Sequence, residues 1–244
     1  MGDIGMAVTH SAFVCPKRST GMRLCHCVVV LFLFAYTGRA SAAPSQYFVL
    51  VFASERDGPS MNYSHTWATF VKATAALPQG FILETHTISW LPENGMIRVA
   101  ALLPEPGRNF NLQSTFTWAL DSGQRIFMWG PYQINQDLYR RALAQQALLE
   151  SGVVRYKAID TGRRSDRVSN CVHAVTGVPD GHRLRVTSLQ WGETASALVT
   201  REMEPWLINP CQTHDWLVCA LGLNRYPIVR RNLEIPRQSL FLPR

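Results

Sequence analysis

Short apolar segments, separated by turn residues, dominate the chain between residues 46 and 103. The first is a continuous run of β-branched and aromatic residues, and the second alternates between apolar and polar positions. Both patterns are typical of strands that are buried on one or both faces. Clusters of Pro, Gly and Asn divide the segments. We predict an antiparallel meander of four strands at residues 46–53, 64–71, 81–90 and 96–103.

Helical periodicity begins after this meander. Asn111 and Asn135 each precede a helical apolar pattern, which predicts one helix over residues 112–121 and another that ends before Gly152. Strands followed by helices indicate an α+β fold, in which helices pack on an antiparallel sheet. The remaining predictions are a loop at 104–108, strands at 124–129 (ended by Gly130-Pro131), 153–159 and 226–230, and helices at 192–203 and 215–221.

The first 42 residues resemble a secretory signal peptide. Lys17, Arg18 and Arg23 precede an apolar run at residues 24–36, and the small residues 40–43 follow it. The run is shorter than the roughly 20 residues that a membrane span needs. We therefore predict a signal peptide at 1–42 that is cleaved after Ala42, and a single domain at 43–244. The protein is expected to be exported, periplasmic or secreted, with membrane contact only through the signal peptide.

The protein has a mild excess of positive charge with or without the predicted signal peptide. The formal net charge is +7, and removal of the leader would lower it to about +4. No basic run with interleaved aromatic residues is present, so we expect no nucleic-acid partner. A weak preference for anionic surfaces, such as a cell wall or lipid headgroups, is compatible with this charge.

Cysteine usage points to one thiol. The predicted mature chain keeps Cys171, Cys211 and Cys219, and an odd number in an exported protein indicates a reactive thiol. Cys211 and Cys219 could form a disulfide and leave Cys171 free. The same two cysteines, with His214, could instead bind zinc, but their spacing is not that of a standard structural site. We expect no metal and no cofactor.

Cys171 lies at the predicted start of a short helix, directly after the N-cap residue Asn170. A helix N-terminus and nearby cations lower the pKa of a thiol, and Arg163, Arg164 and Arg167 lie just upstream. This pattern predicts a nucleophilic thiolate. The alternative is a buried structural cysteine, which is the commoner fate of a free cysteine.

A nucleophilic cysteine needs a base, usually histidine, and the base needs an orienting partner. His173 is only two residues from Cys171 on the same helix and points elsewhere. His182 lies in a glycine-flanked turn, and His214 next to Asp215 favours helix capping. His65 and His86 lie on the two strands of one predicted hairpin. If facing residue numbers sum to about 151, these two imidazoles lie directly opposite each other.

These residues carry a resemblance to a known family. His65-Thr66-Trp67-Ala68 at a strand start, His86 on the next strand and the later Asn170-Cys171-x-His173 resemble the circularly permuted NlpC/P60 papain-like superfamily, in its lecithin:retinol acyltransferase-like branch. The resemblance covers mainly residues 46–103 and 153–178. It implies that Cys171 is the nucleophile, His65 the general base and His86 the orienting third residue. Residues 104–152 form a larger insertion than this family leads us to expect.

Two functions follow from the sequence. The first is an exported cysteine hydrolase or acyltransferase that acts on an amide or ester bond of a cell-wall peptide or a lipid, with backbone N–H groups at the Cys171 helix start as oxyanion donors. The second is a non-catalytic exported structural or ligand-binding module of the same fold. In that module, Trp67 and Trp90 could belong to a ligand-binding face or to the core.

Overall fold

The computed structural model describes residues 43–57, 64–76, 80–160, 165–179, 184, 186 and 191–233. These residues belong to a single unit, Ala43–Arg244. The predicted signal peptide lies outside the described residues, as do Arg163, Arg164 and His182. Within the described part of the chain, no helix is long and apolar enough to span a bilayer.

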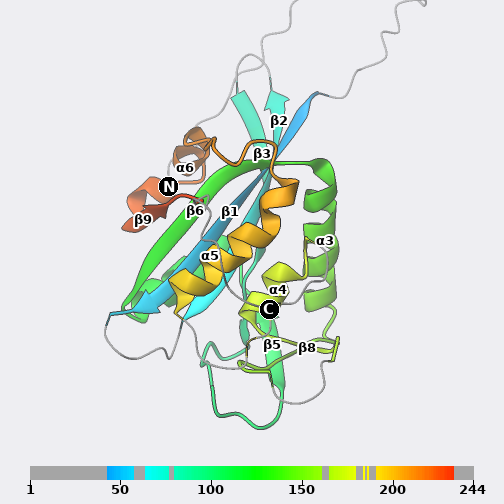
Figure 1. The fold of residues 1–244 in the computed structure, drawn as a ribbon, viewed down its shortest axis with the longest axis vertical. Helices are drawn as coiled ribbons and strands as arrows, with labels where there is room; N and C mark the ends of the chain where they lie inside the picture. The colour runs from blue at the N-terminus through cyan, green and yellow to red at the C-terminus, as the bar shows by residue number, and fades with distance from the viewer. Residues whose placement is uncertain are drawn as a thin grey trace, which may run out of the picture. The chain divides into compact units, whose positions relative to one another are not determined.

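Two mostly antiparallel sheets and several helices confirm the predicted α+β class (Figure 1). The main sheet has the order β3-β2-β1-β6-β9, and only the β6–β9 pair is parallel. The second sheet has the order β4-β5-β7-β8. The strands of the main sheet are β1 (Ser45–Arg56), β2 (His65–Ala76), β3 (Gly80–Ile88), β6 (Gln124–Ile134) and β9 (Ile228–Arg231). Those of the second sheet are β4 (Trp90–Pro92), β5 (Glu105–Asn109), β7 (Arg155–Tyr156) and β8 (Val168–Ser169).

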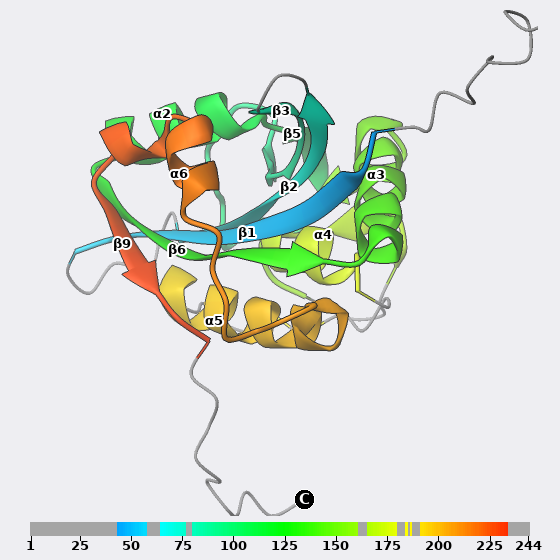
Figure 2. The same cartoon turned by 90° about the horizontal axis from the view of Figure 1, so that it is seen from above.

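Helices cover both faces of the main sheet (Figure 2). One face, called the α4 face below, packs against α3 (Gln136–Glu150), α4 (Cys171–Thr176) and α5 (Gly192–Met203). The other, called the α2 face, packs against α2 (Leu112–Asp121) and α6 (Trp216–Ala220). The 3-10 turns η1 (Glu204–Trp206) and η2 (Leu223–Arg225) follow α5 and α6.

This sandwich explains why β1 is apolar at every position from Tyr47 to Ala53. Phe48, Leu50 and Phe52 pack on the α2 face, whereas Val49 and Val51 pack on the α4 face. Successive side chains of a strand point to opposite faces, so a strand covered on both sides is a continuous apolar run.

The predicted helix starts are confirmed at atomic level. The side-chain Oδ1 atoms of Asn111, Asn135 and Asn170 accept hydrogen bonds from first-turn backbone N–H groups at 2.8 to 2.9 Å. Each cap satisfies a donor that the helix itself leaves free.

The predicted strand at residues 96–103 is wrong. This apolar segment is a loop with turns, and Leu102 and Leu103 are 88% and 79% exposed. The strand that pairs with β4 and β7 is instead β5, at residues predicted to be a loop. Gly107 permits this pairing, because a Cβ atom there would lie 2.1 Å from the indole of Trp90.

Two further boundaries need correction. β6 does not end at Gly130-Pro131 but continues to Ile134, with an irregularity in its register opposite Val49 and Val51. Such a bulge lets a strand accommodate the missing N–H of a proline. The strand predicted at 153–159 is reduced to Arg155–Tyr156, where β5 and β8 supply partners.

Candidate functional site

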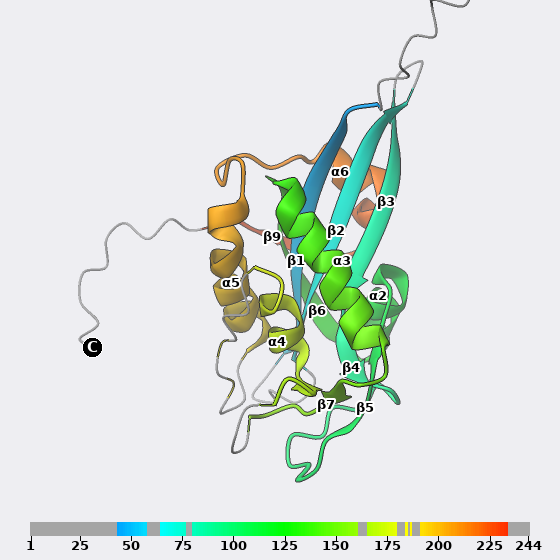
Figure 3. The same cartoon turned by 90° about the vertical axis from the view of Figure 1, so that its right-hand side faces the viewer.

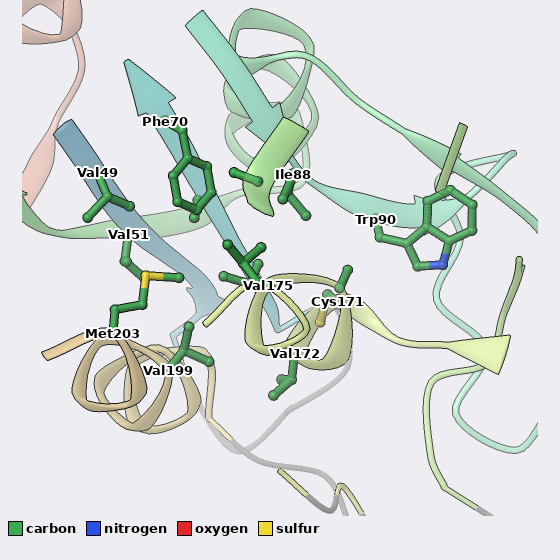
Figure 4. Packing of buried hydrophobic residues seen from close by; sticks show 14 of the residues in the cluster. Val49, Val51, Phe70, Ile88, Trp90, Cys171, Val172, Val175, Val199 and Met203 are labelled. Atoms are coloured by element: carbon green, nitrogen blue, oxygen red, sulfur yellow. The ribbon is translucent and has the colours of Figure 1, made fainter. Parts of the chain in front are cut away.

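Cys171 occupies the first position of α4 and packs within the core of the α4 face, among Trp90, Val172 and Val175 (Figure 4). Asn170 caps the helix through its bond with the backbone N–H of His173, at 2.9 Å. The thiol-bearing residue is only 9% exposed. The helix start was therefore predicted correctly, but it faces the core and has little contact with solvent.

The electrostatic surroundings of the thiol differ from the prediction. Burial raises the pKa of the Cys171 thiol above its ordinary value, although the backbone N–H groups of Thr66, Val172 and Cys171 itself act in the opposite direction. Arg167 is exposed, and the other two upstream arginines lie outside the described residues. A neutral thiol, not a preformed thiolate, is the form expected at neutral pH.

His65 lies on the α2 face of β2. Its ring stacks on Trp67 with a centroid distance of 5.4 Å and meets Trp118 of α2 edge-on at the same distance. The next residue, Thr66, faces the other way, toward Cys171 and α5. The structure therefore places the His65 imidazole and the Cys171 thiol on opposite faces of the main sheet, and the predicted Cys–His pair is not assembled.

The His65 imidazole is held within the core. Its Nε2 lies 2.9 Å from Ser89 Oγ, and the Thr115 hydroxyl of α2 lies 2.8 Å from the same oxygen. Burial lowers the pKa of His65 to about 3. The ring is therefore neutral at neutral pH, and its environment disfavours the imidazolium that a general base must form.

His86 lies on the α4 face but contacts α3. Its Nδ1 is 3.1 Å from Gln146 Oε1, and its ring meets Tyr139 edge-on at 5.8 Å. The predicted register is wrong, because His86 pairs with Phe70 and the facing residue numbers sum to 156. A register change by an odd number turns every side chain of one strand to the other face. His65 and His86 thus lie on opposite faces and not side by side.

His173 has a structural position. Its Nε2 lies 2.7 Å from the backbone oxygen of Leu184 and 3.2 Å from Asp160 Oδ2. The Asp160 carboxylate also accepts a hydrogen bond from the backbone N–H of Val186. This buried histidine therefore joins α4 to the segment that precedes α5.

The tryptophans, the other two cysteines and His214, which the sequence also marked as candidates, lie in the core or at the surface of the domain. Trp67 and Trp90 are buried, so they belong to the core and not to an exposed ligand-binding face. Cys211 and Cys219 are free, exposed thiols, without the proposed disulfide. His214 packs its ring against Phe48, at 4.9 Å between centroids.

Sequence reasoning missed a cleft of about 490 Å³ beside α5. We call it the α5 cleft. Its lining comes from β6, α5 and the end of β9: Trp129, Glu193, Thr194, Ala197, Arg201, Arg231, Asn232 and Leu233. Arg231 pairs with Glu193. Arg201 is exposed and forms no ion pair with any described residue. No motif marked these positions, because the cleft joins segments that are far apart in the sequence.

Comparison with protein-family models, curated proteins and solved structures gives no match for this chain.

Proposed function

We propose that this protein is an exported, non-catalytic binding module that holds a small anionic ligand in the α5 cleft. The observation that carries the proposal is the charge inside the cleft. Arg201 contributes a cation without a carboxylate partner among the described residues, whereas Arg231 is already paired with Glu193. A cleft with one uncompensated guanidinium favours an anion, and Arg binds carboxylate and phosphate groups well.

The size and the walls of the α5 cleft support the same proposal. Its volume of about 490 Å³ is in the usual range for small-molecule sites. Trp129, Ala197 and Leu233 provide apolar lining near the two arginines. A ligand with one anionic group and a flat apolar body would match both parts of this surface.

The separation of His65 from Cys171 supports a non-catalytic function. A cysteine nucleophile with a raised pKa requires a base that can take its proton. The family resemblance assigned this task to His65, but that ring is fixed to Ser89 on the other face of the sheet.

The proposal can be tested with 8-anilinonaphthalene-1-sulfonate, an aromatic sulfonate that fluoresces in apolar sites. We expect the full chain to bind the dye, and Arg201→Gln to weaken binding by about tenfold or more, as for the loss of a charged hydrogen bond. Arg140→Gln is the matched control, since Arg140 is an exposed helical arginine on α3 whose partner Asp137 lies 3.5 Å away. Equal affinities for both variants, with unchanged thermal unfolding, would refute the proposal.

A second candidate is the cysteine hydrolase or acyltransferase that the family resemblance implies. It is favoured by the three backbone N–H groups at the Cys171 sulfur, which are of the kind that stabilise an oxyanion. The test is hydrolysis of p-nitrophenyl acetate by the full chain. Activity that disappears in Cys171→Ser and falls in His65→Ala would favour this enzyme over the binding module.

A further inference from the structure

The loop between β4 and β5 has the most exposed large apolar side chains in the described part of the chain. Leu102 and Leu103 are 88% and 79% exposed, and Met96 is 54% exposed. Isolated apolar residues on a surface are ordinary, but two adjacent leucines with this much exposed surface are costly in water. This loop, residues 93–104, is called the leucine loop below.

The leucine loop projects from one end of the described unit, beyond the second sheet (Figures 1 and 3). The two views, turned by 90°, agree that it is the outermost described segment at this end, next to β5. The end of β2 and the start of β3 lie at the other end of the main sheet. A projecting convex loop can enter a soft surface more easily than it can match a flat rigid one.

Two cationic side chains of the β7 region hold the leucine loop in position. Lys157 Nζ donates to the backbone oxygen of Leu102 at 2.8 Å, and Arg155 Nε donates to that of Pro104 at 3.2 Å. Backbone oxygens next to the leucines thus have partners, which reduces the cost of moving this backbone out of water. The loop therefore presents its leucines on a braced backbone.

The same side chains place positive charge beside the leucines. Arg155 is exposed and has no carboxylate partner among the described residues. Within the loop, Arg98 lies 3.7 Å from Glu105, and the exposed Glu93 at the start of the loop adds a second carboxylate. The positive charge beside the leucines therefore comes from Arg155 and Lys157. Exposed apolar residues next to cations match the interface of an anionic bilayer, where apolar side chains enter the acyl boundary and cations meet the headgroups.

From this arrangement we infer that the leucine loop is a docking site for an anionic lipid surface. A second copy of the chain is a poorer occupant, because it would bring the same cations toward one another. This inference is independent of the proposed ligand in the α5 cleft.

The first experiment is hydrogen–deuterium exchange of the full chain with vesicles of phosphatidylserine and phosphatidylcholine. We expect slower exchange in peptides that cover the leucine loop, and no slowing with vesicles of phosphatidylcholine alone. Because the readout is local, binding through another segment, including the N-terminal apolar run, cannot imitate it. Unchanged exchange in the loop, even if the protein sediments with the vesicles, would overturn the inference.

Variants provide the second measurement. The pair Leu102→Asp and Leu103→Asp should lower vesicle affinity by at least about tenfold for each residue. Arg155→Gln should lower it by about fivefold, and added salt should reduce that difference. Ile82→Asp is the matched control, since Ile82 is 63% exposed near the start of β3, whereas the leucine loop follows the other end of that strand through β4. Equal effects of the loop and control variants, or leucine-dependent self-association without vesicles, would contradict lipid docking.

Discussion

The two faces of β2 provide different environments for the two residues that the sequence predicted to react together, His65 and Cys171. On the α2 face, a chain of hydrogen bonds joins His65 Nε2, the Ser89 hydroxyl and the Thr115 hydroxyl within an aromatic core. On the α4 face, Cys171 packs among Trp90, Val172 and Val175, and backbone N–H groups lie next to its sulfur. Consecutive strand residues supply the two environments, because His65 and Thr66 point in opposite directions. Two residues that are suitable for the same chemistry can therefore be separated by the full thickness of a sheet.

The largest expected effect concerns the aromatic core of the α2 face. Trp67 is fully buried between Phe52 and His65, at centroid distances of 5.2 and 5.4 Å. Trp67→Ala should lower the free energy of unfolding by about 3–5 kcal/mol, because it leaves a large cavity. Denaturant unfolding measures the loss, and Ile82→Ala, at a position that is 63% exposed, is the control. A loss below about 1 kcal/mol would contradict the assigned packing.

The next prediction concerns the reactivity of the thiol on the α4 face. Its burial and raised pKa should make iodoacetamide labelling of native Cys171 slower than that of Cys211 by on the order of a hundredfold. Site-resolved mass spectrometry measures both rates in one sample, and unfolding should make them similar. Rapid native labelling that depends on His65 would remove the contrast between the two faces and favour the enzyme.

The third prediction uses the proton balance of His65. Its pKa is about 3 in the folded protein and near 6.5 when unfolded, so below pH 6.5 the unfolded state binds the additional proton. Stability should therefore fall as the pH decreases, by about 2 kcal/mol between pH 6.5 and pH 5. In His65→Gln this contribution should be absent. Urea unfolding at both pH values measures it, and an equal pH dependence in the variant would refute a buried neutral imidazole.

The smallest effect concerns the start of α4. Asn170→Ala removes the side-chain oxygen that accepts the His173 backbone N–H, and should lower the free energy of unfolding by about 1 kcal/mol. It should also accelerate Cys171 labelling, because the first turn becomes easier to open. Asn135→Ala, at the α3 cap, should have a similar cost in unfolding without changing the labelling rate. Identical labelling in the two variants would show that the cap does not restrain the thiol.

The local elements of this protein were largely predictable because their causes are local. Three helix starts could be predicted from Asn111, Asn135 and Asn170, because an N-cap hydrogen bond joins residues only three positions apart. The continuous apolar run of β1 predicts a strand that is covered on both faces. Together these signals determined the α+β class.

Other features depended on partners that no local pattern identifies. Residues 96–103 are apolar enough for a strand, yet the available pairing with β4 and β7 goes to residues 105–109. The α5 cleft likewise joins Trp129, Arg201 and Arg231, which no sequence spacing connects. The strand pairing and the cleft are formed by contacts between distant segments, so the sequence of one segment does not reveal them.

The amino-acid sequence alone was enough to locate the apolar strand β1 and the capped helix starts, including the one at Cys171. Only the tertiary structure decided which groups meet. The β2–β3 register places His86 opposite Phe70, and it differs by an odd number from the register that would bring His86 beside His65. The side-chain period of a strand is two residues, so that difference transfers one imidazole to the other face. Pairing and packing over the whole domain set the register, whereas the cap of a helix is set by its own first turn.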